Sequence, residues 1–133
     1  MDRFGRTITF ASPHFPRHAH DAELANAETM RGFALASHIG EALAGRGTKV
    51  SAFIAEDWGW YCEIRLAEAA IAYGVVAEDD GEEFLIQFIP DKPFVRKLFR
   101  KIDIAEPLAQ LQDDVFATLQ AAPSSSPPAW SEG

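Results

Sequence analysis

The chain has 133 residues, of which 47% are hydrophobic, and this suits one domain with a substantial core. Its net charge of −8 argues against nucleic acid as the main partner, because binding to phosphates needs a basic surface. A single cysteine excludes an internal disulfide and a four-cysteine zinc site. The sequence has no long apolar run for a membrane span and no signal-peptide pattern, so we expect a cytoplasmic protein.

The first third of the chain predicts a strand, a loop and a helix. Residues 6–10 alternate and contain β-branched side chains, which indicates a strand at a sheet edge. Residues 11–21 hold two prolines and three histidines and predict a loop. Residues 22–44 predict the main helix, with Ser12 and Asp21 both of a suitable type to cap it and Gly45 at its end. Its apolar stripe comprises Gly32, Leu35, Ala36, Ile39, Ala42 and Leu43.

Residues 49–91 predict an antiparallel meander of strands at 49–55, 58–66, 69–77 and 84–89. In the second of these strands, alternate residues form one apolar face: Trp58, Trp60, Cys62, Ile64 and Leu66. Cys62 is therefore expected to be a buried core thiol rather than a nucleophile. The Asp80-Gly81 pair predicts a hairpin turn, and the strand after it is apolar on both faces, which favours a central position.

The last third predicts two helices and a tail. Residues 93–102 combine an apolar stripe with a basic face, and a second helix begins near Asp103 or Glu106. Residues 122–133 are rich in serine and proline and predict a disordered tail after a single domain at 1–121. The order β-α-β-β-β-β-α-α predicts an α+β two-layer sandwich, in which helices pack on one face of an antiparallel sheet.

Three groups of residues are candidates for chemistry or binding. His14, His18 and His20 could ligate a metal, although their spacing matches no familiar motif and a solvated loop is the favoured interpretation. Glu56 and Asp57 precede two tryptophans. The carboxylates could bind a cation or act as acid and base, and Trp58 and Trp60 could form a ligand wall; a turn with core tryptophans is favoured.

The third group is basic. Five of the twelve basic residues lie within ten positions, and the four on the predicted helix are Arg96, Lys97, Arg100 and Lys101. Like charges four residues apart weaken an isolated helix, so we expect these basic side chains to interact with acidic groups. The favoured interpretation is pairing with the chain's own acidic turns, and the alternative is an external anionic protein or phosphate ligand.

The EDWGW turn, the strand that follows it and the segment PFVRKLFRKID resemble, in combination, a family of small uncharacterised bacterial proteins, mostly from proteobacteria. The resemblance covers roughly residues 30–119. It implies a shared architecture, and it implies no catalytic residue because no activity is known for the family. The histidine loop lies outside it.

Two classes of function remain open from the sequence. The favoured one is a protein-binding, adaptor-type domain, comparable with immunity proteins or chaperones in size and charge alone. A homodimer through a sheet edge or an open sheet face is compatible with it. The alternative is a small-molecule-binding or metal-dependent enzyme with a pocket near Trp58 and Trp60. No catalytic motif is present, and we expect no cofactor.

Overall fold

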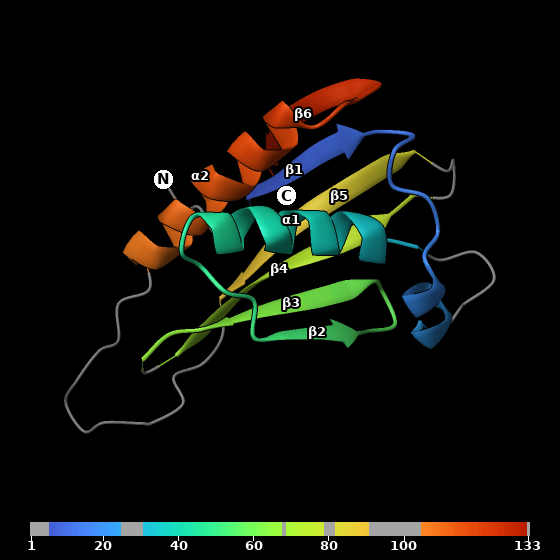
Figure 1. The fold of residues 1–133 in the computed structure, drawn as a ribbon. Helices are drawn as coiled ribbons and strands as arrows, with labels where there is room; N and C mark the ends of the chain where they lie inside the picture. The colour runs from blue at the N-terminus through green and yellow to red at the C-terminus, as the bar shows by residue number, and fades with distance from the viewer. Residues whose placement is uncertain (1–5, 25–30, 68, 79–81, 91–104, 133) are drawn as a thin grey trace.

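The computed structural model describes residues 6–24, 31–67, 69–78, 82–90 and 105–132. These residues form one antiparallel sheet in the strand order β2-β3-β4-β5-β1-β6, and two α-helices lie on one face of it (Figure 1). The elements in chain order are β1 (Arg6–Ala11), the 3-10 helix η1 (Ala19–Glu23), α1 (Phe33–Gly45), β2 (Ala52–Ala55), β3 (Trp60–Arg65), β4 (Ala70–Ala77), β5 (Glu83–Pro90), α2 (Ala105–Ala121) and β6 (Ser126–Glu132). The predicted α+β sandwich is confirmed.

The meander β2 to β5 follows the alternation of the sequence. Its register places Trp60 opposite Val75, Cys62 opposite Tyr73 and Ile64 opposite Ile71, all on the face that the helices cover. The predicted central strand, β5, pairs with β4 on one side and β1 on the other. No helix within the described ranges has the length and apolar character to cross a membrane.

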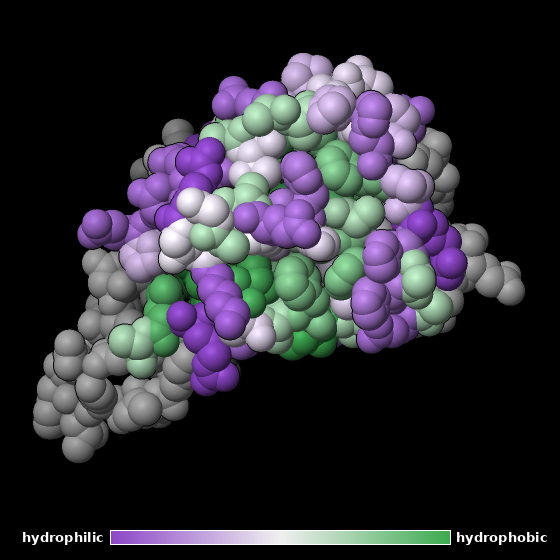
Figure 2. Space-filling view, viewed as in Figure 1, coloured by the Kyte–Doolittle hydropathy of each residue, from purple (hydrophilic) through white to green (hydrophobic). Residues whose placement is uncertain are grey.

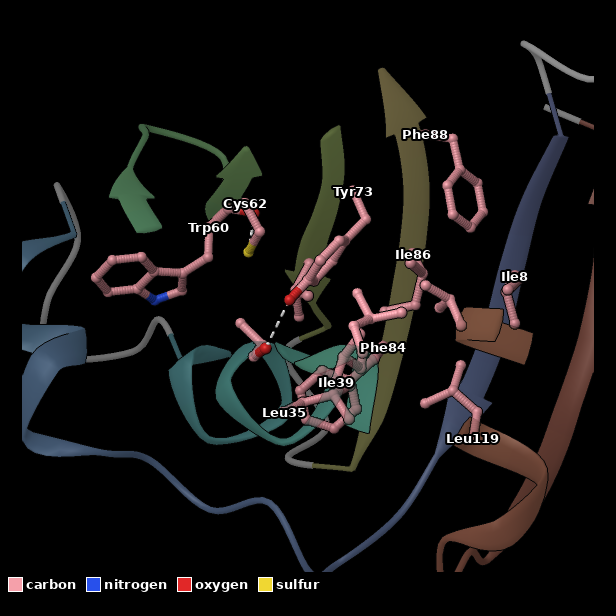
Figure 3. Close-up of a cluster of buried hydrophobic side chains, with 14 of the residues drawn as sticks. Ile8, Leu35, Ile39, Trp60, Cys62, Tyr73, Phe84, Ile86, Phe88 and Leu119 are labelled. Atoms are coloured by element: carbon pink, nitrogen blue, oxygen red, sulfur yellow. Dashed lines mark hydrogen bonds between the residues drawn. The ribbon is translucent and has the colours of Figure 1, made fainter. Parts of the chain in front are cut away.

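The core lies between the sheet and the two helices (Figure 3). The Tyr73 hydroxyl donates a hydrogen bond of 2.9 Å to the main-chain carbonyl of Ala36, which ties β4 to the first turn of α1. This bond allows a tyrosine to be buried without an unsatisfied hydroxyl. Cys62 lies beside it and is fully buried, as predicted.

The helix predicted over residues 22–44 is shorter in the structure. Helix α1 begins only at Phe33, and its N-cap Gly32 has a φ of 141°, a conformation that favours glycine. The earlier residues Ala19–Glu23 form η1, which ends where Leu24 takes an extended conformation. The apolar residues keep helical spacing on both sides of Gly32, so the predicted helix continued past the N-cap at which α1 begins.

The C-terminal segment is a strand over Ser126–Glu132, so the prediction of a disordered tail is wrong there. Strand β6 pairs with β1, which consequently lies inside the sheet and not at its edge as predicted. Proline is compatible with an edge strand because one side of that strand needs no ladder donors. Trp130 fastens β6 to the domain by stacking on Phe116 of α2 at 5.3 Å. The predicted basic helix at 93–102 lies outside the described residues.

Candidate functional site

The EDWGW motif forms the tight turn between β2 and β3. Glu56 and Gly59 exchange main-chain hydrogen bonds of 2.8 and 3.4 Å, so Asp57 and Trp58 are the two central residues of the turn. Gly59 has a φ of 151°, and a Cβ atom there would collide with the main-chain oxygen of Val75. Close contact between the turn and β4 therefore requires glycine at this position.

The two tryptophans lie on opposite faces of the sheet, which corrects the prediction of a shared face. Trp60 is 1% exposed and belongs to the core beneath α1. The Trp58 ring covers Gly74 on the other face, where a Cβ atom would lie 2.8 Å from the ring. The hairpin turn interrupts the period-two pattern between these residues. Trp58 and Trp60 therefore do not form one wall of a pocket.

Asp21 organises the region between the histidine loop and the sheet. Its carboxylate is 0% exposed and accepts hydrogen bonds from the Trp60 indole N–H at 2.8 Å, the Phe33 main-chain N–H at 3.0 Å and the His18 main-chain N–H at 2.8 Å. Because Phe33 is the first residue of α1, Asp21 caps that helix from twelve positions upstream. Asp21 therefore caps a helix, as predicted, but that helix begins at Phe33 and not directly after Asp21.

The histidine loop has structural contacts within the described residues. His18 caps η1, since its Nδ1 accepts a hydrogen bond from the His20 main-chain N–H at 3.0 Å. The rings of His18 and His20 stack on each other and both contact Phe33, while His14 is exposed. The described part of the chain contains no group of three or more histidine, cysteine or acidic side chains able to hold a metal ion.

The most unusual surface is the open edge of the sheet at β2. No described strand pairs with its outer side. Phe53 and Ile54 are 36% and 40% exposed, and they are the exposed large hydrophobic residues of the described structure. Figure 2 shows hydrophobic surface along this strand, below α1. Sequence reasoning missed this site because the sequence identified a strand over these residues without placing it at an edge.

The opposite edge of the sheet differs in its chemistry. Strand β6 carries Pro127 and Pro128, which have no main-chain N–H, and its pairing with β1 contains a register shift between Thr9 and Ala11. Prolines and bulges are two of the devices that protect an edge strand from pairing with another chain. Strand β2, with the sequence AFIA, contains no proline, lysine or other charged residue. The two edges are therefore unequal, and β2 is the one suited to pairing.

Two of the pockets lined by described residues lie away from Trp58 and Trp60. One, of about 270 Å³, lies between the ends of β1, β5 and β6 and includes Glu78, Glu83 and Ser126. The other, of about 210 Å³, lies between α1, α2 and the β3–β4 hairpin. Its lining is mainly apolar, with Asp114 at one side held by Arg46 at 3.4 Å and by Gln110 at 3.0 Å.

The remaining candidate residues are separate from these surfaces. Burial raises the pKa of the Cys62 thiol to about 12, and a hydrogen bond with Tyr73 offsets only part of the effect, so Cys62 is not activated as a nucleophile. Glu56 is half-buried and Asp57 exposed, at one end of β2. The four basic residues Arg96, Lys97, Arg100 and Lys101 lie outside the described residues.

No family model, curated protein or solved structure matches this chain. The family resemblance carried by the EDWGW and PFVRKLFRKID motifs therefore stays a prediction.

Proposed function

We propose that this protein is a protein-binding domain, and that it binds through the open edge of β2. The observation that carries the proposal is the exposure of Phe53 and Ile54 on an edge strand without a protective residue. An edge of this kind recognises an extended chain by main-chain hydrogen bonds, and its side chains on either face supply selectivity. Large exposed apolar side chains at such an edge are characteristic of interaction sites.

The alternative of an enzyme beside the two tryptophans has less support. Trp60 is buried with its indole N–H bound to Asp21, and Trp58 lies on the other face of the sheet. Nucleic acid is disfavoured as a partner by the net charge of −8. The basic residues at 96–101 are a second candidate surface for an acidic protein, and changing all four to glutamate tests that surface separately.

Affinity capture from the organism's own lysate, followed by quantitative mass spectrometry, tests the proposal. The decisive variant is Ile54→Lys, which places a charge on the β2 edge. The matched control is Ala129→Lys, an exposed position on the opposite edge strand β6. We expect the same proteins to be captured by the wild type and the control, and to be lost with Ile54→Lys. The proposal would be contradicted if the wild type captured no protein, or if the wild type and both variants captured the same set of proteins.

A further inference from the structure

The hydrogen-bonding pattern of the β2–β3 hairpin defines which main-chain groups face outward. Glu56 and Gly59 form a hydrogen-bonded pair, and such pairs alternate along an antiparallel ladder. The pair Ile54–Tyr61 is therefore also hydrogen-bonded, whereas Phe53 and Ala55 direct their N–H and C=O groups away from β3. Within the described structure these groups face the open side of the sheet.

We infer that the strand that pairs with this edge is β2 of a second copy of the chain. The inference rests on the proposed function and specifies the partner. The two β2 strands would run antiparallel about a two-fold axis at Phe53, and each Phe53 would exchange both main-chain hydrogen bonds with the partner's Phe53. Only an outward-facing residue can occupy this position, and Phe53 is at the middle of the exposed part of the strand.

The charges at the two ends of the strand favour this arrangement. Lys49 lies four residues before Phe53 and Asp57 lies four residues after it, and both are exposed. An antiparallel pair would bring the Lys49 end of each β2 strand to the turn of the other copy, which carries Glu56 and Asp57 just beyond the end of the strand. A surface that pairs with itself must be self-complementary, and opposite charges at the two ends of the strand meet that condition. A parallel arrangement would place like charges together.

The side chains also suit pairing with an identical strand. Phe53 points toward the helix-covered side of the edge, where its ring lies 5.6 Å from that of Phe33. Ile54 points to the other side, by the alternation of the strand. Pairing across the axis would cover these apolar side chains on both faces of a continuous sheet. The contact is small, so we expect a reversible dimer whose population depends on concentration.

Sedimentation equilibrium of the purified full chain over a wide concentration range tests the inference. We expect the wild type to dimerise, and Lys49→Glu and Asp57→Lys each to weaken the dimer about tenfold, because each change places two like-charged pairs across the axis. An equimolar mixture of these two variants should regain wild-type association, since the mixed dimer has an opposite-charge pair at each end. The variant Ile54→Lys should be monomeric, and Ala129→Lys should behave as the wild type.

The outcomes separate the second-copy inference from the proposed function. A wild-type monomer at every concentration would overturn the inference, while the lysate capture with Ile54→Lys would still decide whether the edge binds another protein. A dimer that Ile54→Lys leaves intact would also overturn the inference, because the contact would then lie elsewhere. A mixture of the two charge variants that remains monomeric would overturn the two-fold register at Phe53.

Discussion

The indole N–H of Trp60 donates a 2.8 Å hydrogen bond to the buried carboxylate of Asp21. The bond joins η1 to β3, the second strand of the meander, across 39 positions of the chain. The same carboxylate oxygen also accepts the first main-chain N–H of α1, at Phe33. One side chain thus sets the position of the helix over the sheet edge at which β2 and β3 lie.

Replacing Asp21 by alanine should destabilise the protein strongly. Three N–H groups would lose an acceptor that is itself fully buried, and we expect a loss of about 2–4 kcal/mol in the free energy of unfolding. Urea unfolding monitored by tryptophan fluorescence provides the measurement. The control Asp113→Ala changes an exposed acidic residue on α2 and should cost much less. Equal costs for the two variants would show that the three hydrogen bonds contribute little.

Gly59 and Gly45 should respond in opposite ways to alanine. At Gly59 the new Cβ would collide with the Val75 carbonyl and φ would be unfavourable, so we expect destabilisation of roughly 2 kcal/mol or more. At Gly45 a Cβ meets nothing within 4 Å and the residue is helical, so the change should be neutral or stabilise by up to about 1 kcal/mol. Thermal unfolding of both variants checks the contrast, and a tolerated Gly59→Ala would contradict the described turn.

Stability should fall in alkaline solution because of Cys62. Burial raises its pKa from 9.0 to about 12, so between these values the unfolded chain releases a proton that the folded chain retains. The unfolded state then binds fewer protons, and the free energy of unfolding decreases as pH rises, by up to about 1.4 kcal/mol per pH unit for this group. Burial raises the pKa of Tyr73 as well, which adds a decrease of the same sign.

Chemical denaturation at pH 8 and pH 10.5 measures this effect, and the comparison with Cys62→Ala isolates the contribution of the thiol. We expect a smaller decrease with pH in the variant. In the folded wild type at neutral pH, the thiol should also react with an alkylating reagent only as fast as the protein unfolds. Rapid alkylation under native conditions, or identical pH dependence in the two proteins, is the outcome that would oppose this assignment.

Trp130 should be needed to hold β6 in the sheet. Its ring stacks on Phe116 and lies 4.3 Å from the Arg6 guanidinium carbon, although the side chain is only half-buried. We expect Trp130→Ala to cost about 1–3 kcal/mol and to make residues 122–133 sensitive to limited proteolysis. Ser131→Ala, at the neighbouring exposed position, should leave the cleavage pattern unchanged. A protease-resistant Trp130→Ala variant would show that β6 is held mainly by its main-chain bonds to β1.

Much of the fold could be predicted because the meander residues alternate regularly and face one core. The errors occur where a tertiary contact overrides the local pattern. Helical spacing continues through Gly32, but the chain turns there because Gly32 packs beside Val75 and Trp60. The serine- and proline-rich composition of residues 122–133 predicts disorder, but Pro127 and Pro128 are tolerated on an outer strand.

The candidate binding surface was harder to predict than the fold. Residues 49–55 contain the predicted strand, but no local signal shows that this strand is the last in the sheet. The exposure of Phe53 and Ile54 follows from that position and not from their own residue types. The pairing of Asp21 with Trp60 was likewise invisible, because it joins segments far apart in the sequence.

Residue-resolved hydrogen exchange of β2 tests the central claim most directly. The amides of Phe53 and Ala55 face the open side, whereas that of Ile54 faces β3 and serves as an internal control. If the edge is a docking surface, the Phe53 and Ala55 amides will exchange fast in dilute protein and slow at high concentration or with a captured partner, while exchange at Ile54 changes little. Exchange at Phe53 and Ala55 that is unaffected by either condition would contradict the claim.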